Sequence, residues 1–205
     1  MVDALKPKFV LKRRDLSVIA SIIPHRVSLL DLGCGDGTLL KLLAEEKSVR
    51  GQGVEISSAK IMECIAAGVP VIHGDLNRNL IFKDNMFDYT VLSQTIQAVD
   101  RPDILLREML RVSDKVILSF INFGYFKARF QLVLRGRMPV TPNLPDTWYD
   151  TRNIHLATIK DFRDLCRLLN IKIMHEIPLG SNGDFLARLN PNLLAPTCVF
   201  VLTRA

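Results

Sequence analysis

Short apolar runs alternate along this chain with stretches in which apolar residues recur at helical spacing. The runs are typical of buried parallel strands, and the spaced stretches are typical of helices that cover a sheet. The expected strands are 26–32, 51–55, 69–72, 87–92 and 116–120, and the expected helices are 15–23, 38–46, 57–68 and 102–110. This alternation predicts an α/β fold in which helices cover both faces of a mostly parallel sheet.

The helix expected at 57–68 has signals at both ends. Ser57 is placed to cap its first turn, and Gly68 is placed to end it. Ile61 and Ile65 lie one turn apart, so we expect both to face the sheet.

Residues 121–157 interrupt the alternation. Residues 125–134 have the pattern of a basic amphipathic helix, and 137–151 are rich in proline and aromatic side chains. A long insertion over the ends of the strands usually forms a lid or a partner surface. We therefore expect one domain, 1–205, that contains a lid or partner-binding insertion at 121–157.

After the insertion, a capping box and two strands are expected to complete the fold. Thr158 and Asp161 have the spacing of the box, which predicts a helix with Phe162, Leu165, Cys166 and Leu169 directed inward. Residues 171–177 and 198–203 read as the closing strands. A long polar loop between them predicts an antiparallel hairpin.

Three glycines at alternate positions follow the first strand, in the run Asp31-Leu32-Gly33-Cys34-Gly35-Asp36-Gly37. Glycine reaches backbone angles closed to other residues and leaves room for a ligand beside the main chain. The next expected strand ends in Glu55. A strand, a glycine loop, a helix and a second strand that ends in an acid are typical of a nucleotide site whose acid binds the ribose.

The spacing of these glycines does not favour a dinucleotide. The dinucleotide pattern places its third glycine where this chain has Thr38, and Asp36 would repel a diphosphate. S-adenosylmethionine carries no phosphate, and its ammonium group suits an acid such as Asp31. The run resembles the first motif of class I S-adenosylmethionine-dependent methyltransferases. The alternative is an ordinary glycine-rich turn of an α/β protein.

Acids stand at the ends of three successive strands, where ligands of open α/β sheets bind. We expect Asp31 to reach the methionine ammonium, Glu55 the ribose hydroxyls, and Asp75 with Leu76 the adenine. Ser93 and Gln94 leave the fourth strand, where the transferred methyl group would point. A single acid at a strand end is often only a helix cap. The predicted binding set is Asp31, Gly33, Cys34, Gly35, Glu55, Ile56, Asp75, Leu76 and Ser93.

Catalytic residues are harder to find. Ser93-Gln94-Thr95-Ile96 replaces the Asp/Asn-Pro-Pro-aromatic run of enzymes that methylate nucleic-acid amines, and no Pro-Cys nucleophile is present. His155 and Tyr149 are the candidate bases of the insertion, although a lone histidine beside an apolar residue is more often structural. Cys34 lies near a helix N-terminus, which could lower its pKa, but it also suits a small filler role.

Composition narrows the class of protein. The chain has 205 residues and a net charge of +6, with basic clusters at 1–14 and 125–141 that could attract an acidic partner. The cysteines and histidines show no metal-ligand spacing, so no metal is expected and a reducing, cytoplasmic location fits. The sequence shows no signal peptide or membrane span. Aromatic and basic residues do not interleave, so nucleic acid is an unfavoured partner.

Further runs resemble the methionine biosynthesis protein MetW family. Beside Asp31–Gly37 they are Gly53–Glu55, Val91–Thr95, Leu105–Val112, Asn122–Gly124, Leu134–Thr141 and Trp148–His155. Nothing in a generic methyltransferase requires the runs at 134–141 and 148–155, so these are the specific ones. The chain departs from the family pattern at Tyr125-Phe126, where His-Trp is usual, and at Ala157, where cysteine is common.

The resemblance implies a Rossmann-like class I methyltransferase fold with a mostly parallel seven-stranded sheet and an antiparallel C-terminal strand. It also implies an S-adenosylmethionine or S-adenosylhomocysteine site and a role in methionine synthesis beside homoserine O-acyltransferase. It leaves open whether a methyl group is transferred. A protein that regulates this partner and a methyltransferase acting on a small-molecule acceptor are therefore the two hypotheses, ahead of a nucleic-acid enzyme.

Overall fold

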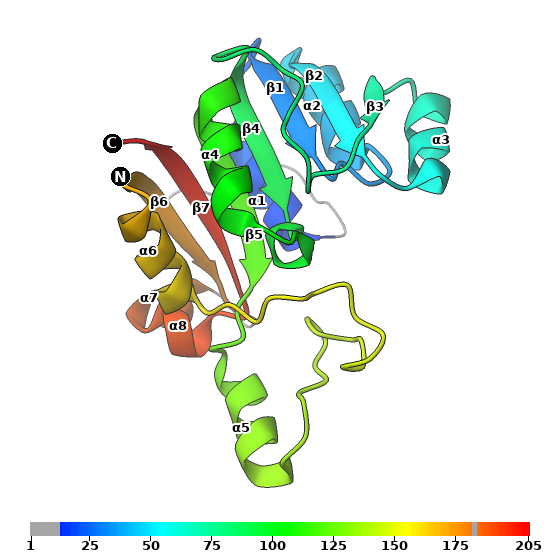
Figure 1. The fold of residues 1–205 in the computed structure, drawn as a ribbon. Coiled ribbons are helices and arrows are strands. Elements are labelled where there is room, and N and C mark those ends of the chain that lie inside the picture. Colours follow the sequence, from blue (N-terminus) through cyan, green and yellow to red (C-terminus); the bar gives the residue numbers. More distant parts are fainter. Residues whose placement is uncertain (1–12, 182–183) are drawn as a thin grey trace.

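A seven-stranded sheet forms the centre of the protein, in a computed structural model that describes residues 13–181 and 184–205. Most of the basic cluster at 1–14 lies outside the described residues, which begin at Arg13. The strand order is β3-β2-β1-β4-β5-β7-β6 (Figure 1). The strands are β1 (Ser28–Leu32), β2 (Arg50–Glu55), β3 (Val71–His73), β4 (Phe87–Ser93), β5 (Ser113–Ile121), β6 (Ile171–Leu179) and β7 (Thr197–Arg204).

Only β7 runs against its neighbours. It pairs antiparallel with both β5 and β6, whereas β1 to β5 pair parallel to one another. The carboxyl ends of the parallel strands therefore meet at one edge of the sheet. The predicted sheet, with its closing antiparallel hairpin, is confirmed.

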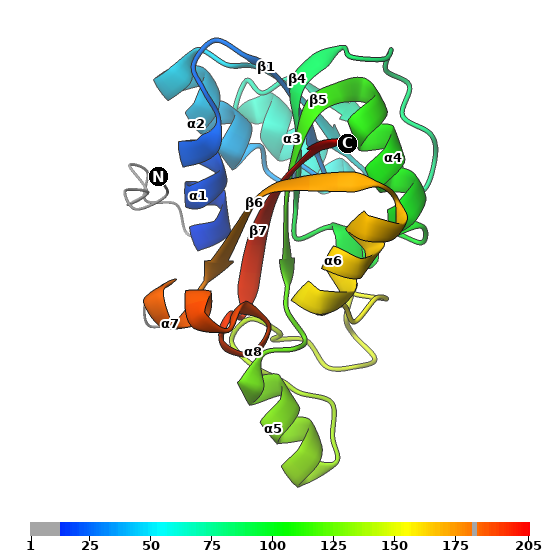
Figure 2. The same cartoon turned by 90° about the vertical axis from the view of Figure 1, so that its left-hand side faces the viewer.

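Helices cover both faces of the sheet (Figure 2). Successive side chains of a strand point to opposite faces, and Leu29 and Leu30 of β1 accordingly belong to two separate apolar clusters. One cluster contains side chains of α1 (Arg14–Ile22), α2 (Thr38–Lys47) and α3 (Ser58–Ala66). The other contains side chains of α4 (Pro102–Val112) and α6 (Ile159–Leu168). Burial on both faces explains why the central strands are apolar without alternation.

Three local predictions are wrong. In α3, Ile65 is 58% exposed and Cys64 faces the core instead, and the Ser57 side chain makes no capping bond. The helix lies over the short β3 at the sheet edge, so only a narrow stripe of it meets other atoms. The expected polar loop between β6 and β7 contains two helices, α7 (Asp184–Leu189) and α8 (Pro191–Leu194).

The insertion begins at a buried asparagine. Asn122 donates from Nδ2 to the carbonyl oxygens of Ala195 and Asn192, and its Oδ1 accepts from the amides of Gly124 and Ile159. One side chain thus joins the start of the insertion to α6 and α8. The capping box of Thr158 on α6 is confirmed.

Beyond this anchor, α5 (Phe126–Arg135) projects away from the sheet in both views (Figures 1 and 2). Only Ala128 of this helix is buried. The helix ends at Gly136 in the left-handed conformation, and the chain returns over the strand ends through 137–157. Between β4 and α4 lies a short 3-10 helix, η1 (Ile96–Ala98). Within 13–181 and 184–205, every helix is too short or too polar to cross a membrane.

Candidate functional site

The glycine loop is held in one conformation by contacts on both sides. Gly33, Gly35 and Gly37 all have positive φ, at 70°, 59° and 76°, which side chains other than glycine rarely adopt. The amides of Gly33 and Cys34 donate to the carbonyl oxygen of Val54 on β2, at 2.8 and 3.2 Å. A Cβ at Gly33 would lie 2.9 Å from Thr95 Oγ1, whereas one at Gly35 would meet no atom within 4 Å. The middle of the loop therefore faces open space.

Glu55 turns its carboxylate onto this loop. Oε2 accepts from the amide of Gly35, and Oε1 accepts from the amides of Ile56 and Ser57, each at 2.9 Å. A carboxylate offers about four acceptor positions, so these three bonds leave capacity for a hydroxyl donor. The acid is fixed at the end of β2 without being saturated.

Asp31, at the end of β1, is a buried acid. Its side chain is 3% exposed and accepts no hydrogen bond from any of the described residues. Burial raises its pKa to about 7, the charge of Arg13 works against that rise, and Glu55 adds to it. A buried carboxylate that accepts no hydrogen bond from the described residues fits a ligand with a positively charged hydrogen-bond donor.

A polar network closes the ends of β4 and β5 against α1. The Arg13 guanidinium donates to both Asp15 oxygens, at 2.6 and 3.2 Å, and to Ser93 Oγ at 2.5 Å. Ser93 and Ser119 donate in turn to Asp15 Oδ2, at 2.9 and 2.7 Å. Burial alone would raise the pKa of Asp15, but Arg13 and the two hydroxyls outweigh it, so the pKa lies below its usual value.

The sequence did not reveal this network. An acid in the first turn of an apolar helix ordinarily faces solvent or supports the helix dipole, and nothing in the pattern links Asp15 to residues so distant along the chain. Ser93, which was expected to border the transferred methyl group, is engaged here with Arg13 and Asp15.

Two cysteines pack beneath the loop. Cys34 Sγ lies 4.0 Å from Cys64 Sγ, and Cys64 donates to the carbonyl oxygen of Gly35 at 3.1 Å. A Cβ at Gly53 would lie 2.6 Å from Cys34 Sγ, so the thiol fills the space above that glycine. Burial raises the pKa of both thiols. The pKa of Cys34 is not lowered, because desolvation outweighs the helix N-terminus, and the packing against Gly53 agrees with the small filler role.

The expected adenine end lies beside a cavity of about 540 Å³ at the ends of β2 and β3. Ile56 and Asp75 both line it. Asp75 uses Oδ1 to accept from the amide of Asn77 at 2.9 Å and so keeps its other oxygen for a ligand. Leu76 instead packs against the core.

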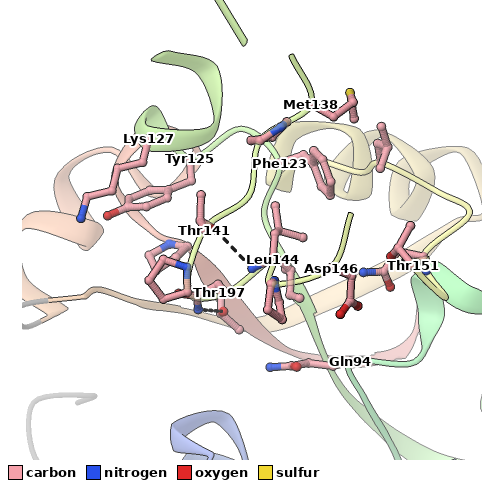
Figure 3. Close-up of a pocket in the computed structure, with 18 of the residues that line it drawn as sticks. Gln94, Phe123, Tyr125, Lys127, Met138, Thr141, Leu144, Asp146, Thr151 and Thr197 are labelled. Carbon is pink, nitrogen blue, oxygen red and sulfur yellow. Dashed lines mark hydrogen bonds between the residues drawn. The ribbon is translucent and has the colours of Figure 1, made fainter. Parts of the chain in front are cut away.

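A larger cavity, of about 1170 Å³, lies between the strand ends and the insertion (Figure 3). Arg13, Asp15 and Gln94 line the side nearest the glycine loop, and the segment 138–154 supplies most of the opposite wall. Gln94 has a φ of 52°, and this left-handed conformation turns the chain directly after Ser93. In Figure 3, Gln94 lies across the cavity from Phe123 and Met138.

Neither candidate base lines this cavity. Its wall includes Ile154 and Leu156 but not the histidine between them, whose Nε2 lies 3.4 Å from the carbonyl oxygen of Asp100. Tyr149 is 74% exposed and its ring packs edge-on against Trp148. The structure therefore brings together Asp31, Glu55 and the glycine loop, and leaves His155 and Tyr149 apart from them.

Comparison with known proteins identifies the family. A family model described as methionine biosynthesis protein MetW matches residues 13–202. The chain is 38% identical, over 93% of its length, to the bifunctional methionine biosynthesis protein MetXA/MetW of Rhodopirellula baltica. It is 28% identical, over 53% of its length, to a demethylmenaquinone methyltransferase of Geobacillus. These matches span 32% and 55% of the two relatives.

Solved structures with the same fold include S-adenosylmethionine-dependent methyltransferases. A possible histamine N-methyltransferase from Thermotoga maritima superposes with a TM-score of 0.68 at 20% identity, covering 93% of this chain and 87% of that one. A methyltransferase from Mesorhizobium loti gives 0.67 at 16% identity, covering 90% and 94%. These structures confirm the predicted class I methyltransferase fold. The family match over residues 13–202 establishes that the chain belongs to the MetW family of methionine biosynthesis proteins.

Proposed function

We propose that this protein binds S-adenosylmethionine or S-adenosylhomocysteine at the glycine loop and acts with, or regulates, homoserine O-acyltransferase in methionine synthesis. The observation that carries the ligand proposal is Asp31, a buried carboxylate that accepts no hydrogen bond from the described residues. A buried acid of this kind is costly unless a ligand supplies its partner. The ammonium group of either ligand would do so.

The other residues of the proposed binding site are assigned to parts of the ligand by where they lie. Glu55 keeps an acceptor position for the ribose hydroxyls, and the open space beside Gly35 admits the ligand to the main chain. Ile56 would pack on the adenine ring and Asp75 would accept from its amino group, with Leu76 behind them. Gly33, Cys34 and Ser93 complete the proposed binding set. When bound, S-adenosylmethionine would supply a methyl group on a positively charged sulfur.

The proposed partner is supported by a natural fusion. In the Rhodopirellula baltica relative, one polypeptide is named for both MetXA and MetW, and this chain matches 32% of it. Joining two proteins in one chain raises their effective concentration and is common for proteins that act together. The proposed contact surface for this partner is the insertion at 121–157, which contains the family-specific runs 134–141 and 148–155.

Calorimetric titration with both ligands tests the binding site. Wild-type protein should bind at micromolar concentration. Glu55→Gln should weaken binding at least tenfold, because an amide cannot replace the charged acceptor that ribose hydroxyls prefer. Glu46→Gln, on the exposed side of α2, is the matched control and should bind as wild type does. Equal binding by the two variants would reject Glu55 as the ribose ligand.

The partner is tested separately. Purified protein and the homoserine O-acyltransferase of the same organism should co-elute at micromolar concentration, and independent elution would reject the partnership. Because the ligand is derived from the product of the pathway, its occupancy could also report pathway output to the partner. Reciprocal coupling then requires the partner affinity to change when the ligand is added. An unchanged affinity would exclude this regulation.

Methyl transfer to a small molecule is the second candidate, and the large cavity favours it. Gln94 and Arg13 both line the cavity, and both adjoin Ser93, so the cavity lies next to Ser93. The methyl group of a bound donor would point there. Alignment supplies most of such a reaction, and a base is needed only if the acceptor is protonated. The proposed bases, His155 and Tyr149, do not line this cavity, so this candidate function fits best an acceptor that has no proton to lose. The test is formation of S-adenosylhomocysteine with a cell extract, which Glu55→Gln should abolish.

A further inference from the structure

The projecting helix α5 carries an apolar stripe that faces away from its own protein. Phe126, Phe130, Val133 and Leu134 recur at i, i+4, i+7 and i+8, which places them on one side of a helix. All four are exposed, Phe130 by 64% and Val133 by 80%. At about 100° per residue, Ala128, the only buried residue of the helix, lies on the opposite side. Phe126 packs edge-on against Tyr125 at the base of the helix, whereas Phe130, Val133 and Leu134 each leave more than half of the side chain uncovered by the described residues.

A cation flanks the stripe on each side. At about 100° per residue, Lys127 lies beside Leu134 on one border of the stripe, and Arg129 lies beside Val133 on the other border. Both side chains are exposed, and Arg129 is held in place by a bond from Nε to the carbonyl oxygen of Gly124 at 2.5 Å. No acidic residue occurs between Asp114 and Asp146. The surface is apolar in the middle and positive at both borders.

We infer that α5 docks, stripe first, into an apolar groove rimmed by carboxylates on the partner protein. This inference rests on the proposed partnership and assigns its contact surface. An amphipathic helix with anchors at i, i+4 and i+7 is a recurrent way to fill a groove, and exposed apolar patches of this kind on a soluble domain mark interaction sites. Carboxylates on the rim complement Lys127 and Arg129.

Other occupants fit less well. A second copy of this chain would have to offer an acidic groove, but its large cavity sets Arg13, Arg14, Lys127 and Arg152 against Asp15, Asp146 and Asp150 and so has no acidic excess. A membrane surface would accept a basic amphipathic helix. The stripe, however, covers little more than two turns of a ten-residue helix, and the fused relative supplies a protein in cis.

The test measures binding to homoserine O-acyltransferase of the same organism by calorimetry. Phe130→Glu with Val133→Glu should weaken binding at least a hundredfold, because charge enters the buried centre of the contact. Leu132→Glu is the matched control, since Leu132 is an exposed apolar residue of the same helix outside the stripe; it should change affinity less than threefold. Binding of S-adenosylhomocysteine should be the same in all three proteins, which shows that they are folded.

Three outcomes would overturn the inference. Wild-type affinity in the double variant would remove the stripe from the interface and leave the partnership standing. Failure of the wild-type protein to bind the acyltransferase would overturn the partnership itself, and the docking assignment with it. Stripe-dependent binding to vesicles of phosphatidylcholine and phosphatidylglycerol, without binding to the acyltransferase, would make α5 a membrane-binding helix.

Discussion

The glycine loop and helix α5 are opposite kinds of structure within one small domain. At the loop, Gly33, Gly37 and Glu55 are fixed by atoms of the same chain. On α5, apolar side chains as large as Phe130 contact little but solvent. Contacts within the chain make a conformation costly to change, whereas side chains in solvent constrain nothing. Substitutions at the loop should therefore change stability, and substitutions on the helix should change only association.

The largest effect is expected at Gly37. Alanine there would combine a left-handed backbone with a Cβ only 3.1 Å from Cys64 Sγ and from Val69 Cγ2. We expect Gly37→Ala to lower the free energy of unfolding by about 2–4 kcal/mol in urea titration. Gly68→Ala has a similar φ with no neighbour within 4 Å, so its loss should be about 1 kcal/mol. Equal losses would show that packing at the loop contributes nothing.

The next largest loss of stability is expected at Asn122, the anchor between the insertion and the rest of the domain. Asn122→Ala leaves the amides of Gly124 and Ile159 and the carbonyl oxygen of Ala195 without their partner. The expected loss is about 2–3 kcal/mol, the cost of unsatisfied buried polar groups. Asn143→Ala, which removes a single long bond to Thr197 Oγ1 at 3.4 Å, should cost less than about 0.5 kcal/mol. A smaller loss for Asn122→Ala than for this control would contradict the anchor.

Asp31 should give the protein a distinctive pH dependence. The pKa is raised from 3.8 to about 7 in the folded state, so between these values the folded protein binds more protons than the unfolded chain. The free energy of unfolding must then fall as pH rises through this window, by at most about 1.4 kcal/mol per pH unit. Asp15, whose pKa is lowered, is ionised in both states above about pH 5 and adds no slope there.

Urea titrations of wild type and Asp31→Asn at several pH values would measure this. The variant should lack the downward slope between about pH 4 and pH 7, and parallel curves for the two proteins would contradict the prediction. S-adenosylmethionine should also release a proton near pH 7, because its ammonium stabilises the ionised acid. Calorimetry in buffers of different ionisation enthalpy would detect that proton.

The smallest effect on stability is expected on α5. Phe130→Ser with Val133→Ser removes two exposed apolar side chains, so the free energy of unfolding should change by less than about 0.5 kcal/mol. Thermal and urea unfolding provide the measurement. A loss of several kcal/mol would mean that the stripe packs within this chain and is not available to a partner.

Much of the fold could be predicted because its signals are local. The order of strands and helices, the capping box at Thr158 and the positions of Asp31 and Glu55 at strand ends follow from hydrophobic period and helix-end chemistry. The errors arise where tertiary contacts decide. Cys64 rather than Ile65 faces inward because α3 covers a short edge strand, and the helices between β6 and β7 are too short to show a period.

The same division holds for the candidate site. The sequence alone determined which residues lie at the carboxyl edge of the sheet. The order of the strands along the chain and the spacing of the glycines can both be recognised from local patterns. Only the tertiary structure decided which of them are free for a ligand. Glu55 bonds the loop, Ser93 is engaged by Arg13 and Asp15, and Asp31 is buried and accepts no hydrogen bond from the described residues. Whether each of these side chains is hydrogen-bonded depends on residues distant along the chain, so local patterns cannot predict it. Burial then decides how much an unpaired polar group costs.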